Sequence, residues 1–142
     1  TLPASSVFSL LSAVSVNASG STYVAYSFAQ IEGFSKFSTY KGNGNADGTF
    51  VYTGFKPKFI LIKRTDGISD WRIYDSVRSP DNVTNELLNP NLTAVEATSG
   101  SDIDILSNGF KMRSTSAGIN ATNATHMFMA FAENPFKNSN AR

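Results

Sequence analysis

The sequence has no cysteine, a single tryptophan and a single histidine, and only 16% of its residues are charged. Without cysteine the chain can form neither a disulfide bond nor a thiolate metal site. The lone histidine, His126, excludes a two-histidine metal centre and a histidine triad, so we expect a packing role for it. No apolar run approaches the roughly 18 residues of a transmembrane helix, and we expect no membrane insertion.

Charge is both scarce and balanced, with twelve Lys and Arg against eleven Asp and Glu. The basic residues are scattered, which argues against a nucleic-acid-binding surface. Globular proteins average roughly 25% charged residues, whereas this chain is rich in Ser, Thr, Asn and Gly. That balance is common in extracellular and virion β proteins, so we expect a virion or extracellular location.

Short runs of β-branched and aromatic residues are the main pattern in the sequence. The densest is Lys58–Lys63 (KFILIK). Pro57 precedes this run and a Thr-Asp-Gly turn follows it, as is typical of a buried strand. Trp71–Asp75 (WRIYD) alternates large apolar and polar residues and predicts its hairpin partner. Similar patterns predict strands at Val7–Leu11, Thr22–Gln30, Phe34–Lys41, Phe50–Tyr52, Ile103–Leu106, Phe110–Met112 and His126–Glu133.

Turn-forming residues separate these runs. The glycine-rich stretch Gly42–Gly48 predicts a loop, and Ser107–Gly109 predicts a tight hairpin because Asn-Gly is the preferred type I′ pair. Ser76–Leu92, with two prolines, predicts an irregular excursion with one helical turn. The sequence thus predicts one all-β domain over residues 1–142. We expect an antiparallel β-sandwich or jelly roll of about nine to ten short strands without a substantial helix.

Part of the sequence is repeated. Asn17–Gln30 aligns without gaps on Asn120–Glu133, with five identical residues in fourteen, and Phe8–Leu10 lies at nearly the same offset from Phe110–Met112. Residues 1–33 therefore resemble the closing hairpin of a preceding copy, and residues 34–142 form one full unit. We expect contacts with other copies of the chain.

One cluster resembles a ligand site: Trp71, Arg72, Tyr74, Asp75 and Arg78. Aromatic faces can stack on sugar rings, while Arg and Asp can hydrogen-bond to hydroxyls, so the cluster is a hypothesis for glycan contact. A lone tryptophan in a β-sandwich is more often a core residue, and that interpretation stays open.

Two pairs of carboxylates, Asp66 with Asp70 and Asp102 with Asp104, are spaced for acid–base chemistry or calcium binding. We favour structural roles in turns, because Asp side chains cap backbone N–H groups there. The Gly42–Gly48 loop resembles a phosphate-binding loop but precedes a strand, where a phosphate loop needs a helix. We therefore expect no enzyme, no cofactor and no metal.

Asn-x-Ser/Thr sequons are numerous, although a chain this rich in Asn, Ser and Thr produces several by chance. They mark exposed loops more securely than they mark glycans. The sequons begin at Asn17, Asn82, Asn91, Asn120 and Asn123.

Several separated motifs carry a family resemblance. The run from Phe34 to Asp66, followed by WRIYD, LLNPNL, DILSNGFKMR and MAFAENPFKNSNAR, resembles an uncharacterised domain of structural proteins of marine tailed bacteriophages. In those virion proteins the domain lies in or near tail-fibre and lectin-like β-sandwich regions. The chain departs from this pattern at Ser27, where cysteine is common, and in a shortened linker at Leu10–Ser12.

The resemblance implies a structural assembly domain of a phage tail fibre or similar appendage, with neighbouring virion proteins as partners. Such a domain displays loops for attachment to a host-surface glycan. Repetition favours multivalent binding, in which weak contacts add up. The alternative is a stand-alone carbohydrate-binding module with Trp71 and Tyr74 as its stacking platform. A polysaccharide-cleaving enzyme would need two carboxylates about 5–10 Å apart in a cleft.

Overall fold

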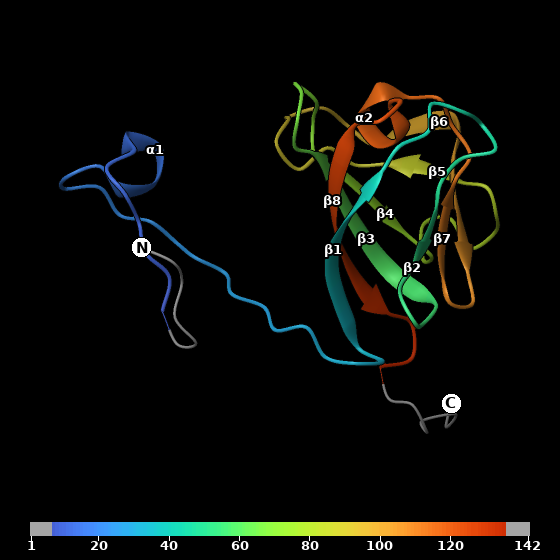
Figure 1. The fold of residues 1–142 in the computed structure, drawn as a ribbon, viewed down its shortest axis with the longest axis horizontal. Helices are drawn as coiled ribbons and strands as arrows, with labels where there is room; N and C mark the ends of the chain where they lie inside the picture. Colours follow the sequence, from blue (N-terminus) through green and yellow to red (C-terminus); the bar gives the residue numbers. More distant parts are fainter. Residues whose placement is uncertain (1–6, 136–142) are drawn as a thin grey trace.

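A computed structural model describes residues 7–135, and the side chains of residues 99 and 101 lie outside the description. Two four-stranded antiparallel sheets face each other (Figure 1). The first has the order β1-β8-β3-β4 and the second β2-β7-β6-β5. The strands are β1 (Ser35–Lys41), β2 (Phe50–Tyr52), β3 (Pro57–Arg64), β4 (Arg72–Asp75), β5 (Thr84–Leu87), β6 (Ala97–Leu106), β7 (Gly109–Met112) and β8 (Thr125–Ala132). The predicted all-β sandwich class is confirmed.

The core lies between the two sheets. Ile60 and Ile62 of β3 and Phe128 of β8 project inward from the first sheet, because alternate residues of a strand share a face. Phe110 of β7 meets Phe128 edge to face, with ring centroids 5.3 Å apart. The KFILIK run is therefore the buried strand that its composition predicts.

Two helices of four residues each, α1 (Val14–Asn17) and α2 (Ala117–Asn120), complete the secondary structure. Neither helix in the described part of the chain has the length or hydropathy needed to cross a bilayer. The single helical turn predicted in Ser76–Leu92 lies only at its start, where Ser79 N donates to Asp75 O at 3.3 Å, and the later part of the segment contains β5, whose residues pair with β6. Local polarity concealed this short strand, which its partner stabilises.

The predicted hairpin at Ser107–Gly109 is present, but its turn differs from the prediction. Leu106 pairs with Gly109, so Ser107 and Asn108 occupy the centre of the turn, and neither has the positive φ of a type I′ turn. Gly109 is already in β7, where a Cβ atom would collide with the carbonyl oxygen of Val51. The glycine permits this close approach to β2.

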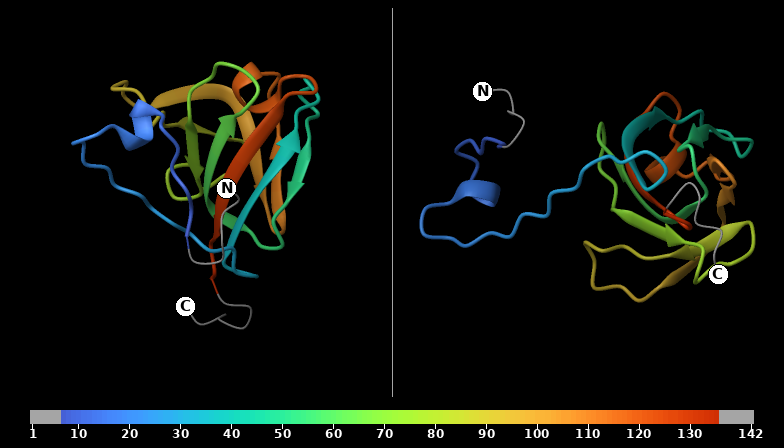
Figure 2. Two further views of the ribbon diagram at one scale, coloured as in Figure 1. Left: turned by 60° about the vertical axis from the view of Figure 1, so that its left-hand side comes forward. Right: turned by 90° about the horizontal axis from the view of Figure 1, so that it is seen from below.

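The predicted strands at Val7–Leu11 and Thr22–Gln30 are wrong for this structure. The segment before β1 extends away from the sandwich, with α1 near its far end (Figures 1 and 2). Residues 22–30 form no strand ladder, although their period-2 pattern favours extended backbone. A strand needs a hydrogen-bonded neighbour, and the described part of the chain supplies none.

Candidate functional site

Three loops meet at one end of the sandwich, which we call the loop end: residues 42–49, 65–71 and 113–124. The register places them together, because Lys41 of β1 pairs with Thr125 at the start of β8, and Arg64 of β3 pairs with His126. The chain enters and leaves the sandwich at the opposite end, where Ala132 N donates to Phe34 O at 2.8 Å. Figure 1 shows this separation, which the eight residues of β8 make roughly 25 Å long.

Asn120 organises the loop end. It is fully buried at the end of α2, and its Oδ1 accepts a hydrogen bond from Asn43 N at 3.0 Å. Its Nδ2 lies within hydrogen-bonding distance of Asn43 Oδ1 (3.0 Å), Asn45 O (2.8 Å) and Ser114 O (2.9 Å). Two of the three loops, at residues 43–45 and at the segment before α2, are thus fastened to each other through one amide. Their tips, including Asp47 and Asn123, remain exposed.

His126, the second residue of β8, is also fully buried. Its ring stacks on Tyr40, with centroids 5.1 Å apart and planes inclined by 13°, and neither ring nitrogen makes a hydrogen bond of good geometry. Burial lowers the pKa of His126 from its ordinary value and outweighs the opposite effect of the nearby backbone of Ala117 and Ala124. The geometry agrees with the packing role expected from the sequence.

The buried histidine predicts a loss of stability in mild acid. The folded protein keeps His126 neutral, whereas the unfolded chain binds a proton below about pH 6.5, the ordinary histidine pKa. The free energy of unfolding should therefore be highest above this pH and fall between pH 6.5 and 5, by at most about 1.4 kcal/mol per pH unit. Urea unfolding at each pH measures this dependence.

His126→Phe is the matched variant, because phenylalanine keeps the stack on Tyr40 and cannot titrate. Its unfolding free energy should vary less between pH 6.5 and 5. An equal pH dependence in the variant and the original chain would contradict the assignment.

The hypothetical glycan cluster separates in the structure. Tyr74 is fully buried, and its hydroxyl donates to Asp102 Oδ2 at 2.8 Å, so Tyr74 cannot stack on a sugar. Arg72 lies on the same buried side, 4.0 Å from Asp102. Trp71 is partly exposed and lines a shallow apolar hollow with Leu61, Pro90 and Asn91. Of the two aromatic residues, only the tryptophan keeps the exposure that stacking on a sugar requires.

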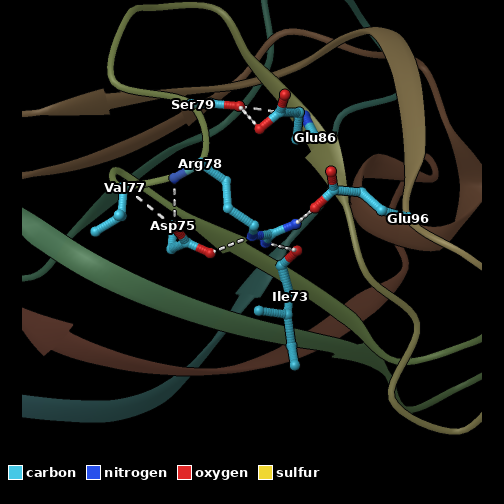
Figure 3. A network of polar contacts seen from close by, with 7 residues as sticks. All are labelled: Ile73, Asp75, Val77, Arg78, Ser79, Glu86 and Glu96. Carbon is cyan, nitrogen blue, oxygen red and sulfur yellow. Dashed lines mark hydrogen bonds and ion pairs between the residues drawn. The ribbon is translucent and has the colours of Figure 1, made fainter.

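Asp75 and Arg78 form a structural network (Figure 3). Arg78 Nε donates to Asp75 Oδ2 at 2.6 Å, Nη1 to Glu96 Oε2 at 2.5 Å, and Nη2 to Ile73 O at 3.3 Å. Asp75 Oδ1 also accepts from the backbone N–H groups of Val77 and Arg78. One guanidinium thus joins β4, the turn after it and the residue before β6.

We expect Arg78→Met to lower the free energy of unfolding by about 1–2 kcal/mol, because it removes charge-assisted bonds from a half-buried pair. Lys56→Met is the control: it breaks an ion pair with Glu133 in which the lysine side chain is 45% exposed, and exposed pairs contribute only about 0–1 kcal/mol. Chemical denaturation of both variants provides the measurement. Equal losses would show that the network adds nothing beyond an ordinary surface pair.

The remaining carboxylates have structural partners. Asp66 receives a hydrogen bond from Arg64 Nε, which with one from Thr125 N lowers the pKa of its carboxyl group. Asp70 accepts from Asn91 Nδ2 at 2.8 Å, and Asp104 lies 3.4 Å from Arg113. Among the described residues, no three His, Asp or Glu side chains lie close enough to hold a metal ion.

The sequons differ in their surroundings. Asn120 is fully buried, so this position cannot carry a glycan in the folded domain. The amide nitrogens of Asn17, Asn82 and Asn91 donate to Leu11 O, Ile105 O and Asp70 Oδ1 respectively. Asn123 is exposed with a positive φ of 58°. Sequence reasoning missed the structural role of Asn120, although its alignment with Asn17 marked the position.

Comparison with known proteins gives one match. A family model described as a domain of unknown function (DUF7483) matches residues 1–135, a span that includes both the extended N-terminal segment and the sandwich. No curated protein and no solved structure is significantly similar to the chain.

Proposed function

Because the chain belongs to the DUF7483 family of domains of unknown function, its role is inferred from its geometry, and we propose a structural display module. The module would belong to a virion or another extracellular appendage, such as a phage tail fibre, and present its loop end for attachment to a host surface. Its partners would be neighbouring structural proteins or further copies of itself.

The observation that carries this proposal is the separation of the two ends of the sandwich. Ile31 and Phe34 enter beside the point where Glu133 leaves, since Glu133 N bonds to Lys56 O and Ala132 N bonds to Phe34 O. A module attached at this end projects its three loops away from the attachment point. Their exposed tips are rich in amides and hydroxyls, which suit hydrogen bonding to glycans.

The hydrogen bonds of the Asn120 side chain support the same proposal. Loops that act in attachment need a fixed shape, because ordering a mobile loop on binding costs free energy. Asn120 ties residues 43–45 to the loop before α2 through buried hydrogen bonds. The display surface is therefore organised before any partner arrives.

Immunogold electron microscopy tests the proposal. Antibodies raised against the folded domain and affinity-selected on residues 43–47 should label an appendage at regular positions on intact particles from the source of the protein. A matched antibody fraction selected on residues 133–135 should label weakly, because that end would be covered by the attachment. Labelling confined to the soluble cell contents, with bare particles, would overturn the proposal.

A carbohydrate-binding module is the second candidate, and the partly exposed Trp71 in its apolar hollow favours it. Under this candidate Trp71→Ala should reduce retention on a glycan array by about fivefold to thirtyfold, since stacking on an aromatic ring contributes about 1–2 kcal/mol. Ile68→Ala is the control, because Ile68 is a fully exposed apolar residue three positions before Trp71 on the same loop. Equal retention of both variants and the original chain would dismiss Trp71 as a sugar platform.

A further inference from the structure

The two short helices occupy equivalent positions at the start of the repeated segment. The offset that aligns Asn17 with Asn120 places α1 on α2, residue for residue. The residues flanking the helices match too: Ala13 and Ser116 have ψ angles of 120° and 128°, and Gly20 and Asn123 have φ angles of 77° and 58°. The N-terminal segment thus folds locally as the closing part of the sandwich does.

The internal hydrogen bonds repeat at the same offset. Asn17 Nδ2 donates to Leu11 O at 2.9 Å, as Asn120 Nδ2 donates to Ser114 O at 2.9 Å. Asn17 N donates to Ala13 O, and Asn120 N to the equivalent carbonyl of Ser116. A chance similarity of sequence would not reproduce these bonds, so the repeat is a folded motif.

The two copies differ in what surrounds them. Asn120 also binds Asn43 and Asn45, and the strand that follows it, β8, lies between β1 and β3. The equivalent residues 22–29 have no strand on either side within the described chain. Val24 and Tyr26 expose 75% and 82% of their surface. The first copy therefore has the helix and the segment equivalent to β8. The described chain has no strands equivalent to β1 and β3 on either side of it.

We propose that residues 8–30 are the closing segment of a second sandwich, a unit of this fold that lacks its own last two strands, the equivalents of β7 and β8. Residues 22–29 would take the β8 position between strands equivalent to β1 and β3. Asn17 would bind a loop equivalent to Gly42–Gly48. The family match extends across this segment, so the segment belongs to the family pattern.

The register predicts which side chains enter the second core. His126, Phe128, Ala130 and Ala132 point inward from β8, and their equivalents at the same offset are Tyr23, Ala25, Ser27 and Ala29. Ala25 is much smaller than Phe128, whose ring packs against Tyr40 and Phe110. The second unit therefore requires a larger residue opposite Ala25, and is a variant of this sandwich with a different core.

An extended chain tests the proposal. Residues 34–109 are placed directly before Phe8, so that the added strands can receive residues 8–30 while the original sandwich stays intact. A second version carries Ala25→Phe, which restores the ring at the Phe128 position. Hydrogen–deuterium exchange should slow at residues 22–29 by at least about 100-fold relative to the original chain in one or both versions, as expected for a strand inside a sheet.

Paired charge substitutions in the extended chain test which face is buried. Ala25→Asp is made in whichever version shows protection, and in the second version it takes the place of Ala25→Phe. It should abolish protection of residues 22–29, because the carboxylate would enter the core. Val24→Asp should retain protection, since its equivalent Met127 is exposed. In both variants residues 35–132 of the original sandwich should stay protected.

Two results would overturn the proposal. One is unchanged fast exchange of residues 22–29 in both extended chains while the original sandwich remains protected. The other is protection in the unextended chain that rises with protein concentration, which would place the segment on the edge of a second intact copy.

Discussion

Asn120→Ala is expected to lower the free energy of unfolding by about 3 kcal/mol, because the fully buried side chain of Asn120 holds several part-buried hydrogen bonds that are all lost at once. The backbone N–H of Asn43 and the carbonyls of Asn45 and Ser114 all contact this amide. Once the amide is gone, these groups must either remain unsatisfied or admit water. Urea denaturation followed by tryptophan fluorescence measures the loss.

Asn120→Asp should be at least as damaging as the alanine variant. It places a carboxylate oxygen where Nδ2 now lies, against oxygens at 2.8–3.0 Å. Asn17→Ala is the control, because Asn17 occupies the equivalent position of the exposed copy and, among the described residues, its side chain bonds locally, to Leu11 O. It should change the stability of the sandwich by less than about 0.5 kcal/mol. Equal effects of Asn120→Ala and Asn17→Ala on the free energy of unfolding would contradict the role of Asn120 in holding the two loops together.

A steep loss of stability in alkali is the second large effect, and two buried tyrosines cause it. Tyr40 donates to Ile119 O at 2.6 Å and Tyr74 to Asp102. Burial raises the pKa of both hydroxyls well above the ordinary value, and the charge of Asp102 raises that of Tyr74 further. The folded protein therefore keeps both protonated where the unfolded chain ionises them.

The direction in which the free energy of unfolding changes with pH follows from proton linkage. Stability is fully present below about pH 10, where tyrosines of the unfolded chain are protonated, and falls above it. Each tyrosine contributes up to about 1.4 kcal/mol per pH unit, so the pair can remove about 5 kcal/mol by pH 12. Urea unfolding monitored by circular dichroism between pH 9 and 12 gives the slope.

Tyrosine-to-phenylalanine variants identify the source of that slope. Tyr74→Phe and Tyr40→Phe should each lower stability at pH 8 by about 1–2 kcal/mol through a lost hydrogen bond, yet each should reduce the slope above pH 10. Tyr26→Phe is the control, since Tyr26 is exposed in the folded state, and should leave the slope unchanged. A slope insensitive to Tyr40 and Tyr74 would place the alkaline effect elsewhere.

Local pattern predicted the strands well where the chain supplies a partner, with β5 as the exception. Lys58–Lys63 lies between β8 and β4, with Ile60 and Ile62 buried against the second sheet, and its apolar composition alone marked it as central. Thr22–Gln30 has an equally clear alternation but forms no strand here. Hydrogen bonding to a neighbouring strand is non-local, and no period in the sequence reports whether that neighbour exists.

The glycan hypothesis failed at Tyr74 for a related reason. Alternation correctly places Arg72 and Tyr74 on one face of β4, but it does not tell which face meets the other sheet. The structure turns Tyr74 toward Asp102, in the core, and leaves Trp71 beside a surface hollow. Which side of a half-polar strand is buried depends on the sheet that packs against it.

The sequence by itself determined an all-β sandwich, its central strand and the existence of a repeated closing motif, because composition and period follow from local backbone geometry. Only the tertiary structure decided that Asn120 ties two loops together, that Tyr74 is internal, and that the first copy of the motif lacks its sheet. Each of these depends on residues distant in the chain being brought together, and the free energy of such contacts comes from burial, which no short window of sequence contains.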